Sequence, residues 1–463
     1  MYYDKLLGLC GYESEEIEEE RQRLERAFTL LQLTPEDFIR AEERVTYFYD
    51  IDLRCVRKML GMWVKSLVDL SMAKEEGKKV VYTAMPPLFH ILNGLAIVSE
   101  DLYVSSPDLL LSTCMGGMFG KITHLMEAAE GDWLPAGSAF CSPIQVKLGA
   151  IKKGIIPMPD LLVSSAHVCD QTPKIDELLN LEYGIPVLYG DGPHDEYEKT
   201  WPAVSDKRVK YVTAESRDIL NKIKDLFGYT VTKETATQAD LIGSKLFIKS
   251  NELFELVKNA DPVPIGFNSF GLLVRACKLG INTTTISSDP EGLLDLCYTE
   301  LKDRIDRGIG VQPKGAPRVG VITLYSIPEP VKIFEDAGLA IIADFTGLSM
   351  PTVDIFESKY TDFWEKSAET LLHFCALKFP RRLMHICKEW NLDGAILNYQ
   401  IGCRDISVGT LKSSELIKQE LGIPSLVLES DLTDPRHLSV EAVRSRVEAF
   451  AEVLKANKAA KSK

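Results

Sequence analysis

An arrangement of residues that occurs once in each half of the chain constrains the fold more than any other feature of the sequence. Each occurrence has an aspartate that opens an apolar run, a cysteine in the following loop, a helical stretch, and a Gly-Ile-Pro tripeptide before another apolar run. The residues concerned are Asp160, Cys169 and Gly184–Pro186 in the first half, and Asp393, Cys403 and Gly422–Pro424 in the second half. Internal duplication of one α/β unit explains this self-similarity.

Short β-branched runs alternate with helical stretches in both halves, a pattern typical of parallel sheets covered on both faces by helices. The runs that we expect to be strands are Val80–Ala84, Leu161–Ser164, Ile185–Tyr189, Val319–Leu324, Ala340–Ala343, Ala395–Asn398 and Ser425–Leu428. The fold class predicted is therefore α/β, with two duplicated Rossmann-like parallel-sheet domains, a helical N-terminal segment and a helical linker.

We expect four regions along the chain: a helical N-terminal segment (1–76), a first α/β domain (77–204), a helical connecting region (205–312), and a second α/β domain with a C-terminal helix (313–463). In the first region, helical spacing of apolar residues predicts one helix from Glu15 to Leu31, ended by Pro35, and another from Leu53 to Ala73. These helices carry no recognisable chemistry, so we expect them to pack against the rest of the chain or a partner.

The cysteine of each copy follows a strand, and open α/β sheets bind ligands just beyond the carboxyl ends of their strands. Cys169 and Cys403 therefore occupy equivalent positions and can converge on one cleft between the two domains. We interpret them as sharing a ligand role.

Composition excludes several classes of protein. The net charge is −14 with the basic residues scattered, which argues against a nucleic-acid partner. No apolar run approaches the roughly 20 residues of a membrane span, and the first residues lack a secretory pattern. We expect a cytoplasmic protein, in which ten cysteines do not form a disulfide framework.

The kind of metal is not decided by spacing alone. Zinc prefers closely spaced ligands, and the chain has no C-x-x-C; the pairs His373/Cys375 and His385/Cys387 have a spacing that separates them on a helix, so we expect core packing there. Iron–sulfur clusters tolerate wide sequence separation between thiolates. Gly116–Lys121 lacks the spacing and hydroxyl of a phosphate-binding loop, so ATP binding by that route is not expected.

Several motifs together resemble the benzoyl-CoA reductase / 2-hydroxyacyl-CoA dehydratase family. They are Cys141–Lys147, Pro159–Val163, Cys169 with Lys174, Asp393–Ile396, Cys403, Gly422–Pro424, Glu429–Arg436, and a C-terminal helix with Arg444, Arg446 and Phe450. They occur in the family's order over roughly residues 77 to 455. Ser142-Pro143, the neighbours of Cys403, and the helical N-terminal extension depart from the pattern.

The resemblance implies that Cys141, Cys169 and Cys403 hold one 4Fe–4S cluster per subunit with an open iron site. It also implies a homologous second subunit, an acyl-CoA substrate, and a separate ATP-hydrolysing iron–sulfur activator that delivers a low-potential electron. The duplication leads independently to Cys169 and Cys403, whereas Cys141 depends on the resemblance. No catalytic acid or base is assigned: Ser164, Ser165 and His167 precede Cys169, and we interpret them as solvated loop residues.

Within the family, Glu429–Arg436 and Lys79–Thr83 favour benzoyl-CoA reductase-type reduction. A 2-hydroxyacyl-CoA dehydratase subunit, which forms an enoyl-CoA through a ketyl radical, is the main alternative. A double-cubane-cluster reductase would need further thiolates, for which Cys114 is the best candidate, although we expect that cysteine to be buried. A non-catalytic electron-transfer subunit is the competing class.

Overall fold

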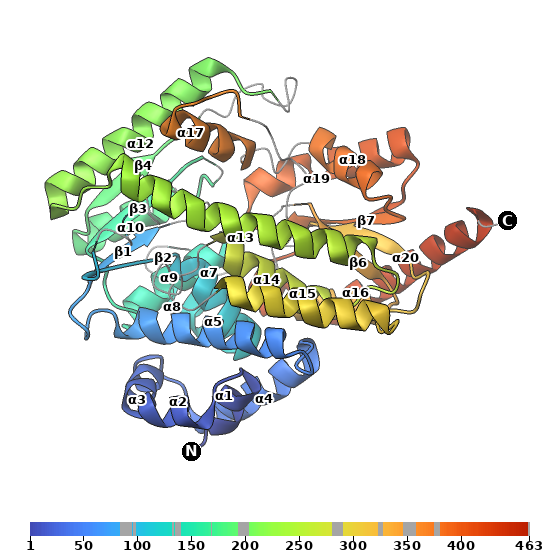
Figure 1. Cartoon of the computed structure of the whole chain (residues 1–463), viewed down its shortest axis with the longest axis horizontal. Coiled ribbons are helices and arrows are strands. Elements are labelled where there is room, and N and C mark those ends of the chain that lie inside the picture. Colours follow the sequence, from blue (N-terminus) through green and yellow to red (C-terminus); the bar gives the residue numbers. More distant parts are fainter. Residues whose placement is uncertain are drawn as a thin grey trace.

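The computed structural model describes residues 1–83, 95, 99–131, 134, 140–167, 169–192, 203–279, 290–322, 327–345, 358–374 and 380–461. Helices form a layer at the N-terminal end of the molecule and surround two separate sheets (Figure 1). Among the helices of these ranges, none combines the length and apolar character that crossing a membrane requires.

The N-terminal layer consists of α1 (Asp4–Leu9), α2 (Ser14–Glu19), α3 (Arg21–Leu30), α4 (Pro35–Phe48) and α5 (Arg54–Met72). The single helix expected over residues 15–31 is two helices that meet at Glu20, so that prediction is wrong in detail. Five glutamates crowd residues 15–20, and like charges one turn apart disfavour a continuous helix. A capping box between Thr34 and Asp37, with proline at the first helical position, begins α4.

The two sheets have the same topology, which confirms the predicted α/β fold and its duplication. The first contains β1 (Lys79–Thr83), β2 (Leu102–Ser105), β3 (Leu161–Ser165) and β4 (Val187–Gly190), in the order β2-β1-β3-β4. The second contains β5 (Arg318–Val321), β6 (Ala340–Asp344), β7 (Gly394–Gln400) and β8 (Ser425–Ser430), in the order β6-β5-β7-β8. All pairings are parallel. The four-residue strand β2 was not predicted.

The duplicated aspartates hold equivalent positions in the two sheets. Asp160 Oδ2 accepts a hydrogen bond from the backbone N–H of Val80 at the start of β1 (2.6 Å), and Asp393 Oδ2 accepts one from Arg318 at the start of β5 (2.9 Å). A lysine pairs with each carboxylate, Lys74 in the first copy and Lys458 in the second. The aspartates therefore fasten the third strand of each copy to the first.

The duplicated Gly-Ile-Pro tripeptides end equivalent helices, α10 (Thr172–Tyr183) and α19 (Arg404–Leu421). Gly184 and Gly422 adopt left-handed backbone conformations, with φ of 67° and 65°, and their N–H groups bond to helix carbonyls. Glycine adopts this conformation without steric cost. In each copy, the tripeptide turns the chain from the helix into the next strand.

The other helices pack around these sheets. They are α7 (Pro107–Leu111), a π-helix (Ser112–Met118), α8 (Thr123–Ala129), α9 (Ser142–Lys152), α12 (Asp206–Phe227), α13 (Lys233–Asn259), α14 (Phe267–Leu279), α15 (Pro290–Asp306), α16 (Glu329–Asp336), α17 (Phe363–Phe374), α18 (Pro380–Glu389) and α20 (Val440–Lys461). In Figure 1, α13 crosses the middle of the view, and α20 projects outward at the C-terminal end.

One large apolar core extends from the N-terminal helices through one face of the first sheet and into the second sheet. A smaller core covers the other face of the first sheet with side chains of α12 and α17. Because α17 follows the second sheet's β6 in the chain but covers the first sheet, the two halves are interleaved. The domain boundaries expected from the sequence stay a prediction.

Candidate functional site

The three candidate cysteines lie at or just before the first turns of three helices. Cys141 is the N-cap of α9 and Cys403 is the N-cap of α19, while Cys169 lies two residues before Gln171, the N-cap of α10. Helix N-termini present free N–H groups and a partial positive charge, which stabilise thiolates and other anions. All three segments therefore favour a negatively charged group.

The side chain of Gln171 joins the three cysteine segments to one another. Its Oε1 accepts a hydrogen bond from the backbone N–H of Cys141 (2.7 Å), and its Nε2 donates to the carbonyl oxygen of Gly402. Gln171 itself follows Cys169 by two residues, and Gly402 immediately precedes Cys403. The structure thus brings together all three cysteine segments that the sequence singled out.

Backbone contact between the Cys141 and Cys403 segments is direct. Gly402 has φ of +79°, and a Cβ atom on it would lie 2.6 Å from the carbonyl carbon of Phe140 and 3.0 Å from the nitrogen of Cys141. Only glycine allows so close an approach without displacement. The pKa of the Cys141 thiol is raised, first by burial and then by the nearby Cys169 and Cys403.

Hydrogen-bond donors surround the sulfur of Cys169. Thr172 Oγ1 donates to Cys169 Sγ (3.2 Å). Burial raises the pKa of the Cys169 thiol, while the Thr172 hydroxyl and the backbone N–H groups of Gln171 and Thr172 oppose that shift. Burial alone would keep the thiols of Cys141 and Cys169 protonated, whereas coordination to a metal would ionise them.

The donor set fits an iron–sulfur cluster. Three thiols from separate segments meet at one junction, with N–H and O–H donors at hand to bond to sulfur, and such bonds tune cluster potential. Within the described ranges, no three His, Cys, Asp or Glu side chains are arranged to hold one metal ion. A cluster places a different demand on the protein, because each cysteine binds a different iron.

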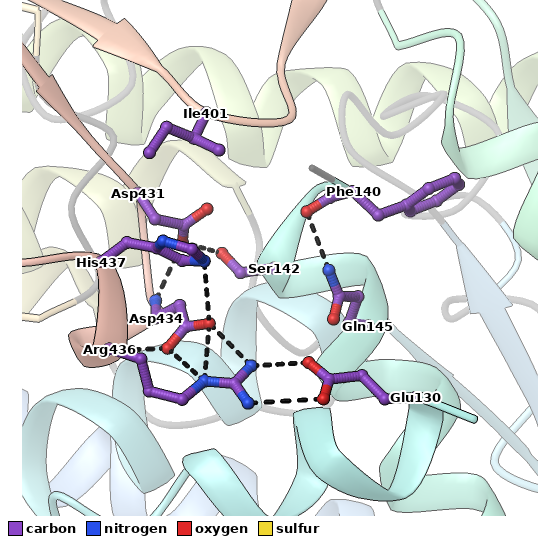
Figure 2. A pocket seen from close by; sticks show the side chains of 9 residues that line it. All are labelled: Glu130, Phe140, Ser142, Gln145, Ile401, Asp431, Asp434, Arg436 and His437. Atoms are coloured by element: carbon purple, nitrogen blue, oxygen red, sulfur yellow. Dashed lines mark hydrogen bonds and ion pairs between the residues drawn. The ribbon is translucent and has the colours of Figure 1, made fainter. Parts of the chain in front are cut away.

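A small polar pocket lies beside this junction and is bounded by both copies (Figure 2). Its lining residues are Glu130, Phe140, Ser142, Gln145, Ile401, Asp431, Asp434, Arg436 and His437. Ser142 Oγ donates to the buried Asp431 carboxylate, which also accepts the N–H groups of Thr433 and Asp434 (2.8 Å each). Burial raises the pKa of Asp431 despite these donors.

Arg436 closes the same pocket across the two copies. Its guanidinium pairs with Asp434 in its own loop and with Glu130 from the first half, both at 2.8 Å. In the sequence, the run Glu429–Arg436 contributed only to the family resemblance, and no role was predicted for its single residues. The structure gives these residues a role, because they attach the loop after β8 to the segment that carries Cys141.

The interpretation of Ser164, Ser165 and His167 as solvated loop residues is wrong. Both serines belong to β3, and all three residues are buried. The strand runs through Ser164, the last residue of the predicted run, to Ser165 and pairs with β4, so both serines are strand residues rather than loop residues. No catalytic role follows from this burial.

The other cysteines considered above are separate from the junction. Cys114 is fully buried in the π-helix, where its Sγ donates to the carbonyl oxygen of Trp63 (3.5 Å). Cys387 is buried in the large core, and burial raises the pKa of its thiol to about 12. Cys375 lies outside the described residues.

A buried ion pair connects the helices that follow two of the cysteines. Lys147 on α9 and Asp176 on α10 are 2.5 Å apart, and each side chain is only 1% exposed. Burial raises the pKa of Asp108 in α7 to about 6, and the positive charge of the nearby Lys147 opposes this shift only in part. The charged pair fixes α9 relative to α10 and hence the Cys141 segment relative to the Cys169 segment.

Fold and site together define a class of protein: a duplicated parallel α/β chain that gathers thiols from both halves at one junction. A family model described as "2-hydroxyglutaryl-CoA dehydratase, D-component" matches residues 97–454. The chain belongs to this family, which confirms the resemblance seen in the sequence.

Curated relatives match most of the chain at low identity. Lactoyl-CoA dehydratase subunit alpha from Anaerotignum propionicum is 22% identical over 431 residues, covering 85% of this chain and 94% of that protein. A benzoyl-CoA reductase subunit from Thauera aromatica is 24% identical over 419 residues, covering 83% and 91%. The (R)-phenyllactyl-CoA dehydratase alpha subunit from Clostridium sporogenes is 22% identical over 412 residues, covering 84% and 92%.

Proposed function

We propose that this chain is the iron–sulfur catalytic subunit of an enzyme that performs low-potential one-electron chemistry on an acyl-CoA thioester. Cys141, Cys169 and Cys403 are the proposed ligands of one 4Fe–4S cluster with an open iron site. The observation that carries the proposal is the Gln171 bridge, since it brings thiol-bearing segments of both copies to a single junction. Membership of a family with acyl-CoA dehydratase and reductase subunits supports the substrate class.

The roles of the protein groups follow from their positions. A cluster bound here would supply a low-potential electron and a Lewis-acidic iron for the thioester carbonyl. The chain would hold that cluster through its three thiolates, with the Thr172 hydroxyl and the Gln171 and Thr172 N–H groups bonded to the Cys169 sulfur. Burial of the Cys141 segment would keep water from a radical intermediate.

Iron analysis tests the proposal directly. Chain purified and reconstituted without oxygen should contain about four iron and four sulfide per chain, with the absorption and electron paramagnetic resonance of a cubane cluster. Replacement of any of the three cysteines by serine should remove most of this iron. A folded protein that binds no iron under these conditions would overturn the proposal.

The branch we favour is benzoyl-CoA reductase-type reduction, supported by the Glu429–Arg436 motif and by similarity to a benzoyl-CoA reductase subunit. Dehydration of a 2-hydroxyacyl-CoA is the second candidate, because other relatives are dehydratase alpha subunits. A double-cubane reductase gains little support, since Cys114 is buried and bonded to Trp63.

Electron stoichiometry separates these branches. The chain would be combined with a homologous second subunit, an ATP-hydrolysing iron–sulfur activator, ATP and a counted dose of reductant. A reductase consumes electrons in fixed proportion to product, whereas a dehydratase recycles its electron through many turnovers. Many products per electron from a 2-hydroxyacyl-CoA would exclude the reductase branch. Bound cluster without turnover of any CoA ester would indicate an electron-transfer subunit.

A further inference from the structure

We propose that Gln171 is a positioning residue that sets the separation of the three cysteine segments through both ends of its carboxamide. Its effect on a cluster rests on the function proposed above, whereas its effect on the Cys141 segment does not. Gln171 is assigned no contact with substrate or reacting atoms.

The hydrogen bonds of the side chain require a carboxamide. One end accepts from the Cys141 N–H (2.7 Å) and the other donates to the Gly402 carbonyl oxygen, so the group must be an acceptor and a donor at once. A carboxylate lacks the donor, and an aliphatic side chain lacks both. Gln171 is 8% exposed, and its loss would leave the buried Cys141 N–H and the half-buried Gly402 carbonyl oxygen without these partners.

The same residue also serves the third segment through its backbone. Gln171 lies two residues after Cys169 and is the N-cap of α10, whose first residue, Thr172, donates its hydroxyl to the Cys169 sulfur (3.2 Å). One residue therefore touches all three cysteine segments: Cys169 by its backbone, and the other two by its side chain.

The junction has little room for adjustment. Because a Cβ atom on Gly402 would lie 2.6 Å from the carbonyl carbon of Phe140, the two backbones already touch. Chain connectivity does not hold the two backbones together, because Cys141 and Gly402 belong to different copies of the unit. The carboxamide lies across this contact, so changing it should alter the spacing of the thiols more than the overall fold.

A second buried glutamine provides a matched control. Gln145 is 4% exposed, and its Nε2 donates to the carbonyl oxygen of Phe140 (2.8 Å), within the Cys141 segment's own half. Gln145→Met removes a buried carboxamide of the same size close to the same cysteine, but it leaves the Gln171 bridge intact. Differences between Gln171→Met and Gln145→Met therefore report the bridge rather than burial.

Hydrogen exchange of the full-length chain tests the positioning without any cluster. In Gln171→Met the Cys141 amide loses its acceptor, so its exchange should accelerate about tenfold or more, as expected for loss of roughly 1.4 kcal/mol of hydrogen bonding. In Gln145→Met exchange at Cys141 should stay within about twofold of the wild-type rate. Unchanged Cys141 exchange in Gln171→Met would overturn the proposal.

Gln171→Glu separates the two ends of the side chain and serves if the methionine variant fails to fold. Its carboxylate can still accept from the Cys141 N–H but faces the Gly402 oxygen without a donor. Exchange at Cys141 should therefore stay near the wild-type rate, while the reconstituted cluster should show altered resonance and faster loss of iron to a chelator. Wild-type resonance and iron retention in both Gln171 variants would also overturn the proposal.

Failure of the inference is distinguishable from failure of the proposed function. If the wild-type chain bound no iron, the proposed function would fall, yet amide exchange would still decide whether Gln171 positions Cys141. If iron bound normally but the Gln171 variants changed neither amide exchange at Cys141 nor the cluster resonance, only the inference would fall.

Discussion

The two copies of the α/β unit present their cysteines from the same topological position but support them differently. In the first copy, α10 is held against α9 by the buried Lys147–Asp176 ion pair. In the second copy, hydroxyls hold α19: Ser407 Oγ donates to the Gln400 carbonyl oxygen (2.8 Å), and Ser414 Oγ bonds to Ser425 Oγ (2.7 Å). Duplication conserved the scaffold while the supporting interactions diverged.

The difference indicates where the site is most sensitive. A buried ion pair leaves an uncompensated charge when one partner is lost, whereas a single neutral hydroxyl bond contributes about 1 kcal/mol. The charged support lies in the copy that supplies two of the three cysteines. We therefore expect perturbations of the first copy to have larger effects than matched perturbations of the second.

The largest effect tests whether the two copies are equivalent at the cysteines themselves. Cys169→Ser and Cys403→Ser should each lose most of the bound iron, because each removes one of three proposed thiolates. Cys387→Ser is the control: it should keep its iron and lose about 1–3 kcal/mol of stability through a buried hydroxyl. Full iron content in both site variants would refute the shared role.

The next effect concerns the ion pair. Lys147→Met leaves Asp176 buried without its partner and should lower the free energy of unfolding by about 3–5 kcal/mol in chemical denaturation. Ser414→Ala, the matched change on α19, should cost only about 1 kcal/mol. The double variant Lys147→Met/Asp176→Leu should recover most of the loss. Equal losses in the two single variants would contradict the expected asymmetry.

The pH dependence of stability probes the same charged support. Burial raises the pKa of Asp108 to about 6, so ionisation of this carboxyl is disfavoured in the folded protein. Its destabilising effect is absent below about pH 4, grows between about pH 4 and pH 6, and levels off above pH 6 at no more than about 3 kcal/mol. Asp108→Asn should therefore gain stability over the wild type between pH 4 and pH 7. If the stability difference between Asp108→Asn and the wild type did not change with pH, Asp108 would not have a raised pKa in the folded protein.

The smallest effect should be the same in both copies. Asp160→Ala and Asp393→Ala each remove the acceptor for a backbone N–H near the start of a central strand, and each should cost about 1–2 kcal/mol. Similar losses from thermal or chemical unfolding would support equivalent strand fastening. A loss confined to one variant would show that the duplicated aspartates have diverged in role.

Local pattern was enough to predict most of the sheet architecture. Seven of the eight strands in the described part of the chain coincide with predicted β-branched runs. The repeated Asp, Cys and Gly-Ile-Pro signals align the two copies without any knowledge of the fold. The strand β2 was not predicted because its four residues, Leu102–Ser105, carry too little periodicity. The burial of Ser164, Ser165 and His167 was not predicted, because polar residues at the end of a strand have the pattern of a loop.

By itself, the sequence determined the duplicated α/β units and the position of Cys169 and Cys403 after equivalent strands, since period and turn chemistry are local properties. Only the tertiary structure decided that the Cys141 segment meets both of them, that Gln171 bridges the copies, and that α17 covers the first sheet. These contacts join residues far apart in the chain. They depend on how buried donors and acceptors find partners once the sheets have packed, and no local pattern records that outcome.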